Sequence, residues 1–298
     1  MSRRSRRRSN SSKLSSTTFP TVTALLGPRT VSSSSQRVDL PSTRSTSTVR
    51  TILIYRELVT HSLLDIAKEL STKEAKELRF TLVLEPDSLA NLVTNLSVEK
   101  CAGAAEAYKD GIAYAIAKLQ FPNVALYIDG AHGGWLGWAD NLEPSANLFG
   151  EVLNRAKTIN PAAKVRGLAT NVSNYNLYNN PTPEPFMEWN PSFDESHYAD
   201  SIAPYLTAAG FPANFIIDQG RSGVAGIRTE GGQWCNVKNA GFGTRPTSDQ
   251  AVLQNAKVDA IVWVKPGGES DGTSDINAVR YDATCRSPVA HIPAPEAG

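Results

Sequence analysis

The sequence lacks the features by which several classes of protein are recognised. No apolar run approaches the roughly 18 residues that a membrane-spanning helix requires, so a span across a bilayer is not expected. A Gly-x-Ser-x-Gly elbow, a Walker loop and a Gly-x-Gly-x-x-Gly motif that opens a helix are all missing, which leaves serine-nucleophile and nucleotide chemistry without a signature. The 298 residues have the composition of a globular protein with one large or two ordinary domains.

Cysteine is also scarce. The chain has three, Cys101, Cys235 and Cys285, and their spacings fit neither a zinc site nor a Cys-x-x-Cys motif. We therefore expect no bound metal. One disulfide with one thiol left over is the simpler interpretation of the odd number.

Acidic residues are almost missing from residues 1–50, where nine Arg and one Lys stand against Asp39 and give a formal charge of +9. The 14 Ser and 8 Thr of this segment leave too little apolar area to offset the entropy of ordering, so we expect a disordered segment. The run Met1 to Arg8 leaves open a nucleic-acid patch, although no aromatic residue is interleaved to stack a base, and also an organelle transit peptide. No secretory signal is visible, because the only apolar island, Val22 to Leu26, is too short.

From about residue 51 the pattern is typical of an α/β protein, and we assign residues 51–298 to one domain. Apolar side chains at helical spacing predict an amphipathic helix from Glu57 to Arg79. Five short apolar runs without strict alternation predict strands that are buried on both faces of a parallel sheet. These runs are Phe80 to Leu84, Val124 to Ile128, Lys164 to Leu168, Asn214 to Ile217 and Ala260 to Val264. Helix-like segments lie between them at Ala102 to Leu119, Ser145 to Ala156 and Ser196 to Ala209.

Polar side chains directly follow each predicted strand. They include Asp87, Asp129, Asn174, Asp218 and Lys265. In a parallel α/β sheet all strand carboxyl ends lie at one edge, and that edge carries the active site, so we expect these residues to converge. Helix capping or loop solvation explains any one of them equally well when it is taken alone.

Carboxylates among these residues suggest acid–base chemistry. Asp87 follows Pro86, which stiffens the turn, and a half-buried carboxyl in this position tends to have a raised pKa and to act as a general acid. Asp129 and Asp271 could supply a base or hold the proton of the acid. Two carboxylates on either side of one bond are the arrangement that glycoside hydrolysis requires.

Three tryptophans occur in predicted loops, where an exposed apolar ring is unfavourable unless it covers a ligand or another surface. Trp135 and Trp138 lie in a Gly-rich loop that begins at His132, and Trp234 lies in another. Flat indoles suit the C–H faces of sugars, and the alternative is that a ring closes the rim of the sheet. Trp263 lies in a predicted strand and is expected in the core. With no partner at ligand spacing, His132 is expected to be a hydrogen-bonding loop residue and not a metal ligand.

Five longer motifs occur in order along the chain. They are Leu82 to Asn95, Tyr127 to Trp138, Arg166 to Asn176, Asp218 to Gly223 and Trp263 to Asp275. Together they closely resemble glycoside hydrolase family 6, in particular its fungal cellobiohydrolases, from about Phe80 to the C-terminus. The resemblance implies the C-terminal part of a distorted (β/α) barrel with about five parallel strands. It also implies an extracellular enzyme that hydrolyses β-1,4-glucosidic bonds in cellulose from chain ends, with inversion and without a cofactor.

The resemblance further implies roles for individual residues. Asp87 corresponds to the proton donor, Asp271 to the carboxylate discussed as the base, and Asp129 to a third acid of the cleft. Positions that contact sugars are matched by His132, Trp135, Trp138, Asn174, Trp234, Lys265 and Glu269. Cys235 and Cys285 match a disulfide that closes the loop containing Asp271. Because this loop has its full length, a tunnel-roofed exo-acting enzyme is favoured over an open-cleft endoglucanase. As partners we expect cellulose and cello-oligosaccharides, with no nucleic acid and no membrane, bound by a monomer.

The N-terminal side departs from the family pattern. The segment from Val38 to Ser45 is the only partial match to the family signature Tyr-Asp-Leu-Pro-x-Arg-Asp-Cys. Arg44 stands in place of its second Asp, and Ser45 in place of the Cys that pairs with the residue matching Cys101. In the family this Asp raises the pKa of the donor, so we expect the pKa of Asp87 to lie near the free value of about 3.9.

Two functions follow from these observations. The first is a working cellulose hydrolase, and the second is a truncated remnant that contacts glucan but catalyses little. A five-stranded part of a barrel should also leave an exposed sheet edge, which residues 1–50 are not expected to cover.

Overall fold

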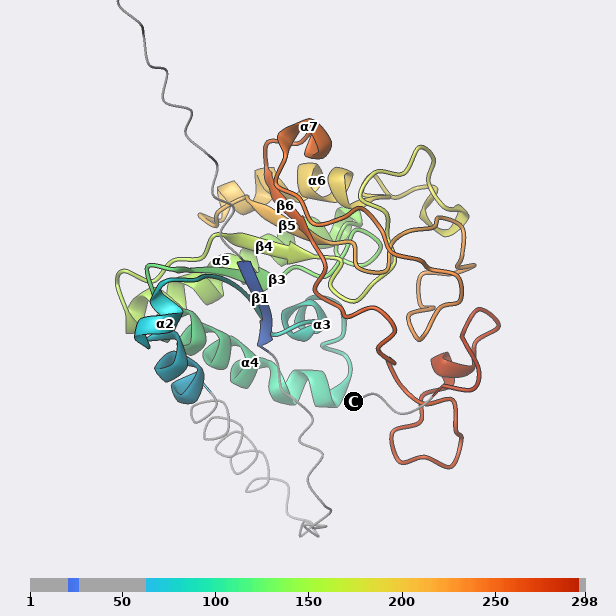
Figure 1. The fold of residues 1–298 in the computed structure, drawn as a ribbon, viewed down its shortest axis with the longest axis horizontal. Helices are drawn as coiled ribbons and strands as arrows, with labels where there is room; N and C mark the ends of the chain where they lie inside the picture. Colours follow the sequence, from blue (N-terminus) through green and yellow to red (C-terminus); the bar gives the residue numbers. More distant parts are fainter. Residues whose placement is uncertain (1–20, 27–62, 295–298) are drawn as a thin grey trace, which may run out of the picture.

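The structure is a computed structural model that describes residues 21–26 and 63–294. Its centre is one parallel sheet in which each strand pairs with the next strand along the sequence, from β1 to β6 (Figure 1). The strands are β1 (Thr21–Leu26), β2 (Arg79–Leu84), β3 (Val124–Asp129), β4 (Gly167–Thr170), β5 (Phe215–Asp218) and β6 (Val258–Val262). The sheet curls into a half-barrel, and all strand carboxyl ends lie at the same edge. The predicted α/β fold with parallel strands is confirmed.

Burial on both faces explains why the strands read as continuous apolar runs. Every residue of β4 and β5 is buried. Successive side chains of a strand point to opposite faces of the sheet. Leu82 and Leu84 accordingly join the main core, whereas Val83 packs with Tyr127 and Ile216 in a smaller cluster on the other face.

Helices cover the face of the sheet that carries the main core. The long ones are α4 (Glu99–Lys118), α5 (Ala139–Ile159) and α6 (Glu195–Ala208). The helix α4 packs against α5 and α5 against α6, while α3 (Ser88–Thr94) packs against both α4 and α5. Shorter elements are α2 (Lys73–Lys76), α7 (Gln250–Leu253) and the 3-10 turns η1 (Pro185–Met187) and η2 (Ala283–Arg286). The long loops that follow β4, β5 and β6 gather on one side of the sheet in Figure 1.

Two element boundaries differ from the prediction. The single helix predicted from Glu57 to Arg79 is a helix over 63–70 within the described residues, a turn, and the separate α2, whose N-cap Thr72 accepts a hydrogen bond from the backbone of Ala75. The strand predicted at Lys164 to Leu168 begins at Gly167. There a Cβ would lie 1.8 Å from the carbonyl oxygen of Asn214, so only glycine permits this approach to β5.

The strand β1 corrects the prediction for residues 1–50. Thr21–Leu26, which we expected to be disordered, pairs in parallel with β2 over its whole length. It contains the apolar island Val22 to Leu26, and the backbone groups along the edge of β2 offer such a segment its hydrogen-bond partners. The expectation that residues 1–50 leave this edge uncovered is therefore wrong. The rest of that segment, with Val38 to Ser45, lies outside the described residues.

Candidate active site

A cleft of about 660 Å³ lies at the carboxyl edge of the sheet. Its walls come from the loops that follow β2 to β6. They include eight residues singled out from the sequence, namely Asp87, His132, Trp135, Asn174, Trp234, Lys265, Glu269 and Asp271, together with Asn91, Ser173 and Arg221. Residues that are up to 184 positions apart in the sequence thus share one depression, as the rule for strand ends predicts.

Asp87 is the N-cap of α3, yet its carboxyl makes no capping hydrogen bond and lines the cleft. Its backbone is left-handed, with φ 66°, and its N–H donates to Oδ2 of Asp129 over 3.0 Å. The residue is accessible to solvent from the cleft, but the surrounding protein desolvates its carboxyl and raises the pKa. The expectation that this pKa lies near the free value is therefore wrong, because burial alone is sufficient to raise it.

Asp129 lies beneath Asp87 at the end of β3 and is buried. Its Oδ2 accepts hydrogen bonds from the N–H groups of Asp87 and Ala131. Desolvation, with the charge of Asp87 as a second cause, raises the pKa of Asp129 to about 8. At neutral and acidic pH this carboxyl therefore carries a proton, and it supports Asp87 from below without lining the cleft.

Asp271 is held by cations. Its two oxygens accept hydrogen bonds from Nη1 of Arg221 at 2.7 and 2.6 Å, and Nζ of Lys265 lies 3.3 Å from Oδ1. The N–H of Asn236 and the hydroxyl of Tyr175 also donate to Oδ2. Lys265 in turn forms an ion pair with Glu269 at 2.9 Å. These contacts fix the carboxyl of Asp271 as a hydrogen-bond acceptor in the cleft wall.

The aromatic residues divide into cleft and rim. Trp135 and Trp234 line the cleft, and Nε1 of Trp135 donates to Thr94 at 2.8 Å, which sets the plane of the indole. Trp138 is the N-cap of α5, its Nε1 donates to the carbonyl oxygen of Gly134, and it is partly exposed outside the residues that line this cleft. Trp263 was expected in the core, but it follows β6, is 37% exposed and stacks on the ring of Phe242.

His132 is surrounded by groups that keep it neutral. Burial, with the charge of Arg228 as a smaller cause, lowers the pKa of His132 to about 3. Arg228 is buried itself, and its Nη1 and Nη2 donate to Oδ1 of Asn174 and of Asn176.

Sequence reasoning assigned no role to Arg221, Arg228, Asn176 or Glu195. Arg221 could have been found, because it belongs to the Asp218 to Gly223 motif directly after a strand. Asn176 could have been found as well, because it ends the Arg166 to Asn176 motif. Arg228 and Glu195 act through contacts between distant loops, which no spacing in the sequence indicates.

Asp218 organises the floor of the site. It ends β5, and its carboxyl oxygens accept hydrogen bonds from four backbone N–H groups, those of Ser173, Gly220, Val264 and Lys265. Desolvation nevertheless raises its pKa. These contacts tie the loops after β4, β5 and β6 to one another, which positions Lys265 and the residues that follow it.

The predicted disulfide between Cys235 and Cys285 is present. It lies against the loop of Asp271, since a Cβ on Gly272 would come within 3.0 Å of the sulfur of Cys285. Cys101 is a free, partly buried thiol on α4.

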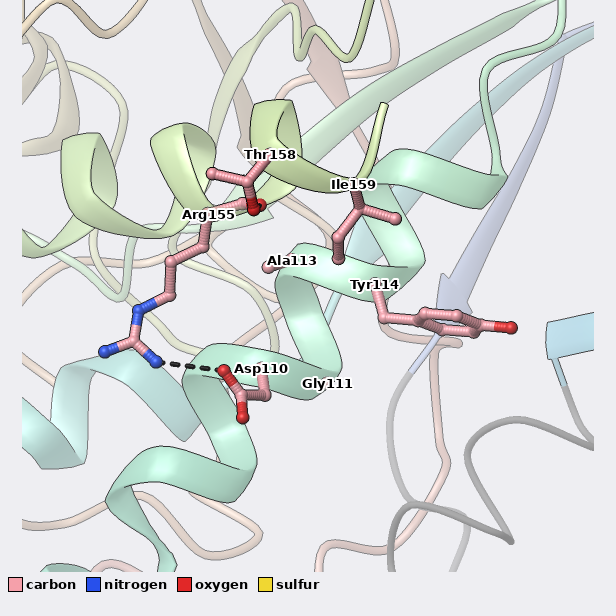
Figure 2. A pocket seen from close by; sticks show the side chains of 7 residues that line it. All are labelled: Asp110, Gly111, Ala113, Tyr114, Arg155, Thr158 and Ile159. Atoms are coloured by element: carbon pink, nitrogen blue, oxygen red, sulfur yellow. Dashed lines mark hydrogen bonds and ion pairs between the residues drawn. The ribbon is translucent and has the colours of Figure 1, made fainter. Parts of the chain in front are cut away.

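A second cavity, of about 390 Å³, lies between α4 and α5 (Figure 2). It is lined by Asp110, Tyr114, Arg155 and small or apolar neighbours, and Arg155 points to Asp110, with which it pairs at 2.9 Å. Arg155 also pairs with Glu106 and Glu151, so its guanidinium is engaged by three carboxylates of the protein. Helices alone form this cavity, and it contains none of the residues that follow strands.

The described part of the chain offers neither a metal-binding cluster nor a membrane-spanning helix. Among the described residues, no group of three or more His, Cys, Asp or Glu side chains is arranged to hold a metal ion. Within that part, none of the helices has both the length and the apolar character that crossing a bilayer would take.

Carboxyl groups and indole rings at the carboxyl edge of a parallel α/β half-barrel define the class of the glycoside hydrolases. The model of the family described as glycosyl hydrolases family 6 matches residues 52–298, and the chain belongs to that family. Its relatives include a protein from Agaricus bisporus named Exoglucanase 3, which is 52% identical over 226 residues. A 1,4-beta-D-glucan cellobiohydrolase from Podospora anserina is 57% identical over 199 residues.

Solved structures agree with this assignment. A family 6 glycoside hydrolase from Coprinopsis cinerea matches with a TM-score of 0.83 and 56% identity, over 93% of this chain and 73% of that one. Cellobiohydrolase II from Humicola insolens, in complex with glucose and cellotetraose, matches with a TM-score of 0.75 and 48% identity, over 83% of this chain and 66% of that one.

The chain spans only part of its relatives. The Agaricus bisporus and Podospora anserina matches cover 76% and 66% of this chain, but 50% and 47% of those proteins. The chain therefore spans about half the length of the curated relatives it matches.

Proposed function

We propose that the chain hydrolyses β-1,4-glucosidic bonds in cellulose and cello-oligosaccharides, as an exo-acting cellobiohydrolase with inversion at the anomeric carbon. The observation that carries this proposal is the position of Asp87. Its carboxyl opens into a cleft that also presents two indole rings, and its pKa is raised, so that it keeps a proton to donate. Family membership and relatives named as cellobiohydrolases support the choice of substrate.

In this mechanism the glucan lies along the cleft, with Trp135 and Trp234 against the faces of its sugar rings. Asp87 donates its proton to the oxygen of the bond that breaks, and water attacks the anomeric carbon from the opposite face. The backbone hydrogen bond from Asp87 to Asp129 holds the donor in its left-handed conformation, which a non-glycine residue adopts only when its surroundings stabilise it.

Asp271 is proposed to act electrostatically. Both oxygens of its carboxyl already accept hydrogen bonds from Arg221, and Lys265 lies 3.3 Å from Oδ1, so protein groups occupy the positions at which the attacking water would be deprotonated. The ion-paired group can still orient that water and stabilise positive charge that develops on the sugar ring. The proton that the attacking water loses passes to solvent water in the cleft, and Asp87 takes up a proton from solvent before the next cycle.

The loop that follows Lys265 supports the exo-acting assignment, because it contributes Glu269 and Asp271 to the cleft wall and is anchored by the disulfide at Cys285. A disulfide is also typical of proteins that work in an oxidising compartment, which supports an extracellular location. We further propose that the chain acts as a monomer on glucan chains and does not bind nucleic acid.

A second function is a glucan-binding protein that catalyses little. The ion pairs of Asp271 favour it, because they leave the cleft without an evident free base among the described residues. In that case the cleft would bind cello-oligosaccharides with or without an intact Asp87.

The two functions are separated by comparing the native chain with Asp87→Asn. Binding of cellotetraose is measured by titration calorimetry, and its hydrolysis by chromatography of the products. We expect the native chain to release cellobiose and Asp87→Asn to bind normally but to hydrolyse about 10²- to 10⁴-fold more slowly. The loss should be smaller on β-cellobiosyl fluoride, whose leaving group needs little protonation.

Asp110→Asn is the matched control, because that carboxyl lies in the helix cavity outside the cleft. Binding without hydrolysis by the native chain would favour the second function. If the native chain neither binds nor hydrolyses cellotetraose, both functions are wrong.

A further inference from the structure

We infer that Glu195 is a positioning residue for the cleft. Its buried carboxyl group joins the start of α6 to the loop after β3 and to the segment after β4, and through Asn176 it sets the hydrogen-bonding state of His132. The inference rests on the proposed function, because it concerns how the same cleft is prepared for a sugar.

Glu195 is the first residue of α6, and its side chain is fully buried. Its Oε1 accepts two hydrogen bonds, from the N–H of Gly133 at 3.0 Å and from Nδ2 of Asn176 at 2.8 Å. Gly133 belongs to the loop of His132 and Trp135, both of which line the cleft. A single oxygen atom thus connects three segments that are far apart in the sequence.

Glycine at position 133 is part of this arrangement. A Cβ there would lie 2.2 Å from the carbonyl oxygen of Ser192, so the loop can press against the segment that leads into α6 only without a side chain. Nδ2 of Asn190 donates to the carbonyl oxygen of Gly133 over 2.8 Å. Both backbone polar groups of Gly133 are therefore satisfied, one by Asn190 and the other by Glu195.

The orientation of the Asn176 amide follows from its partners. Arg228 can only donate, and its Nη2 lies 2.6 Å from Oδ1 of Asn176. The amide nitrogen must therefore face the other way, where it meets Oε1 of Glu195 and, at 3.4 Å, Nδ1 of His132. Because this nitrogen can only donate, Nδ1 of His132 must accept, and the ring proton lies on Nε2.

This tautomer has a consequence for the substrate. A neutral His132 with its proton on Nε2 has one ring N–H left to offer, and the residue lines the cleft. It can donate a hydrogen bond to a sugar hydroxyl without carrying a charge. Glu195 and Arg228 secure this state together, since Glu195 accepts from the nitrogen of the Asn176 amide while Arg228 donates to its oxygen.

Glutamine can replace Glu195 in this role. Burial raises the pKa of Glu195 to about 7, so at pH 5 the carboxyl is neutral, and a carboxamide has the same shape and keeps one acceptor oxygen. The second oxygen, Oε2, is buried and has no hydrogen-bond partner among the described residues, and it lies close to the Thr170 side chain. An amide in place of Oε2 can donate to the hydroxyl of Thr170.

The experiment uses the full chain at pH 5 with the variants Glu195→Ala and Glu195→Gln, and Asp194→Ala as control. Asp194 is the N-cap of the same helix, accepts from the N–H groups of His197 and Asn180 and pairs with the ring of His197, but within the described residues it has no hydrogen bond to Gly133 or Asn176. Two measurements need no substrate: hydrogen exchange of the peptide 130–138, and ¹⁵N NMR of labelled histidine, which reports whether Nδ1 carries a proton. The third is the affinity for cellotetraose.

For Glu195→Ala we expect exchange at Gly133 to be about tenfold faster or more, loss of the single tautomer, and binding of cellotetraose about tenfold weaker, because a buried donor and a buried amide lose their acceptor. Glu195→Gln should match the native chain in all three measurements. Asp194→Ala should lower the melting temperature and shift the signal of His197, whose Nδ1 lies 2.7 Å from Oδ1 of Asp194, but leave the loop exchange and the signal of His132 unchanged.

Native exchange and a native histidine signal in Glu195→Ala would overturn the inference. The same changes in Asp194→Ala would also overturn it, since they would then arise from α6 as a whole. If Glu195→Ala does not fold, Glu195→Asp decides, because its shorter side chain cannot reach Gly133 and must show the faster exchange. If no variant and not even the native chain binds cellotetraose, the proposed function fails, while the exchange and the NMR signal still decide the role of Glu195.

Discussion

At the scale of single residues, the carboxyl groups of the cleft differ in what surrounds them. Asp271 is neutralised by Arg221 and Lys265, whereas Asp129 and Glu195 are buried with backbone and amide donors and no cation at hydrogen-bond distance. Burial without a cation raises the pKa of Asp129 to about 8 and that of Glu195 to about 7. The acids beneath the cleft therefore hold protons under conditions in which exposed acids have lost theirs.

These raised pKa values make the stability of the fold depend on pH. Between pH 4 and 8 the unfolded chain has lost the proton of Asp129 while the folded chain keeps it, so stability falls as the pH rises through this window. The side chain in Asp129→Asn does not titrate, and it keeps an oxygen that can accept the hydrogen bond from the N–H of Asp87. We expect its melting temperature to fall less between pH 5 and 8 than that of the native chain, as measured by circular dichroism. An identical decline in both proteins would contradict the assigned pKa.

At the scale of elements, α5 has two faces with very different contributions to stability. Phe149 is fully buried, and its ring lies 5.8 Å from that of Phe211. Phe149→Ala should lower the free energy of unfolding by about 3 to 5 kcal/mol, because it leaves a cavity in the core. Arg155→Ala, on the face that carries the cavity of Figure 2, should cost about 0 to 1 kcal/mol, since its ion pairs are exposed to solvent. Urea unfolding of both variants measures the difference, and equal losses would contradict this division.

The pairing of β1 with β2 can be tested with proline. Thr23 and Ala24 are neighbours in β1, and alternate N–H groups of a parallel edge strand point toward its neighbour and away from it. One of the variants Thr23→Pro and Ala24→Pro should therefore break a hydrogen bond to β2, while the other should be tolerated. We expect faster amide exchange in 79–84 for one variant only, with exchange in 215–218 unchanged in both. No effect from either variant would show that β1 does not pair with β2 in solution.

At the scale of the whole molecule, the disulfide connects the last loop to the rest of the cleft. Cys235 and Cys285 close a loop of about 50 residues, and removing such a crosslink costs about 2 to 5 kcal/mol. The double variant Cys235→Ser with Cys285→Ser should melt at a lower temperature and bind cellotetraose more weakly than the native chain, because the support of Asp271 is lost. Cys101→Ser, which removes the free thiol, is the control and should change neither property. Native affinity in the double variant would show that the loop is held without the crosslink.

Much of the architecture could be predicted from the sequence, because strands buried on both faces give short apolar runs such as Phe80 to Leu84. The grouping of Asp87, Trp135 and Lys265 also followed from their positions after such runs. The strand β1 could not be predicted, since its pairing depends on an edge that only the folded sheet provides. The network of Glu195 with Asn176 was equally out of reach, because it joins loops whose contact no local pattern encodes.

The sequential order of the sheet has a consequence for how the protein is made. From β2 onward each strand pairs with the one synthesised just before it, so each new unit can add to an existing edge as the chain leaves the ribosome. The cleft matures last, because Asp87 is made early, whereas Lys265 and Asp271 lie beyond β6. A nascent chain that stalls after β6 would therefore keep most of the hydrophobic core and present Asp87 on an unfinished groove that lacks Lys265 and Asp271.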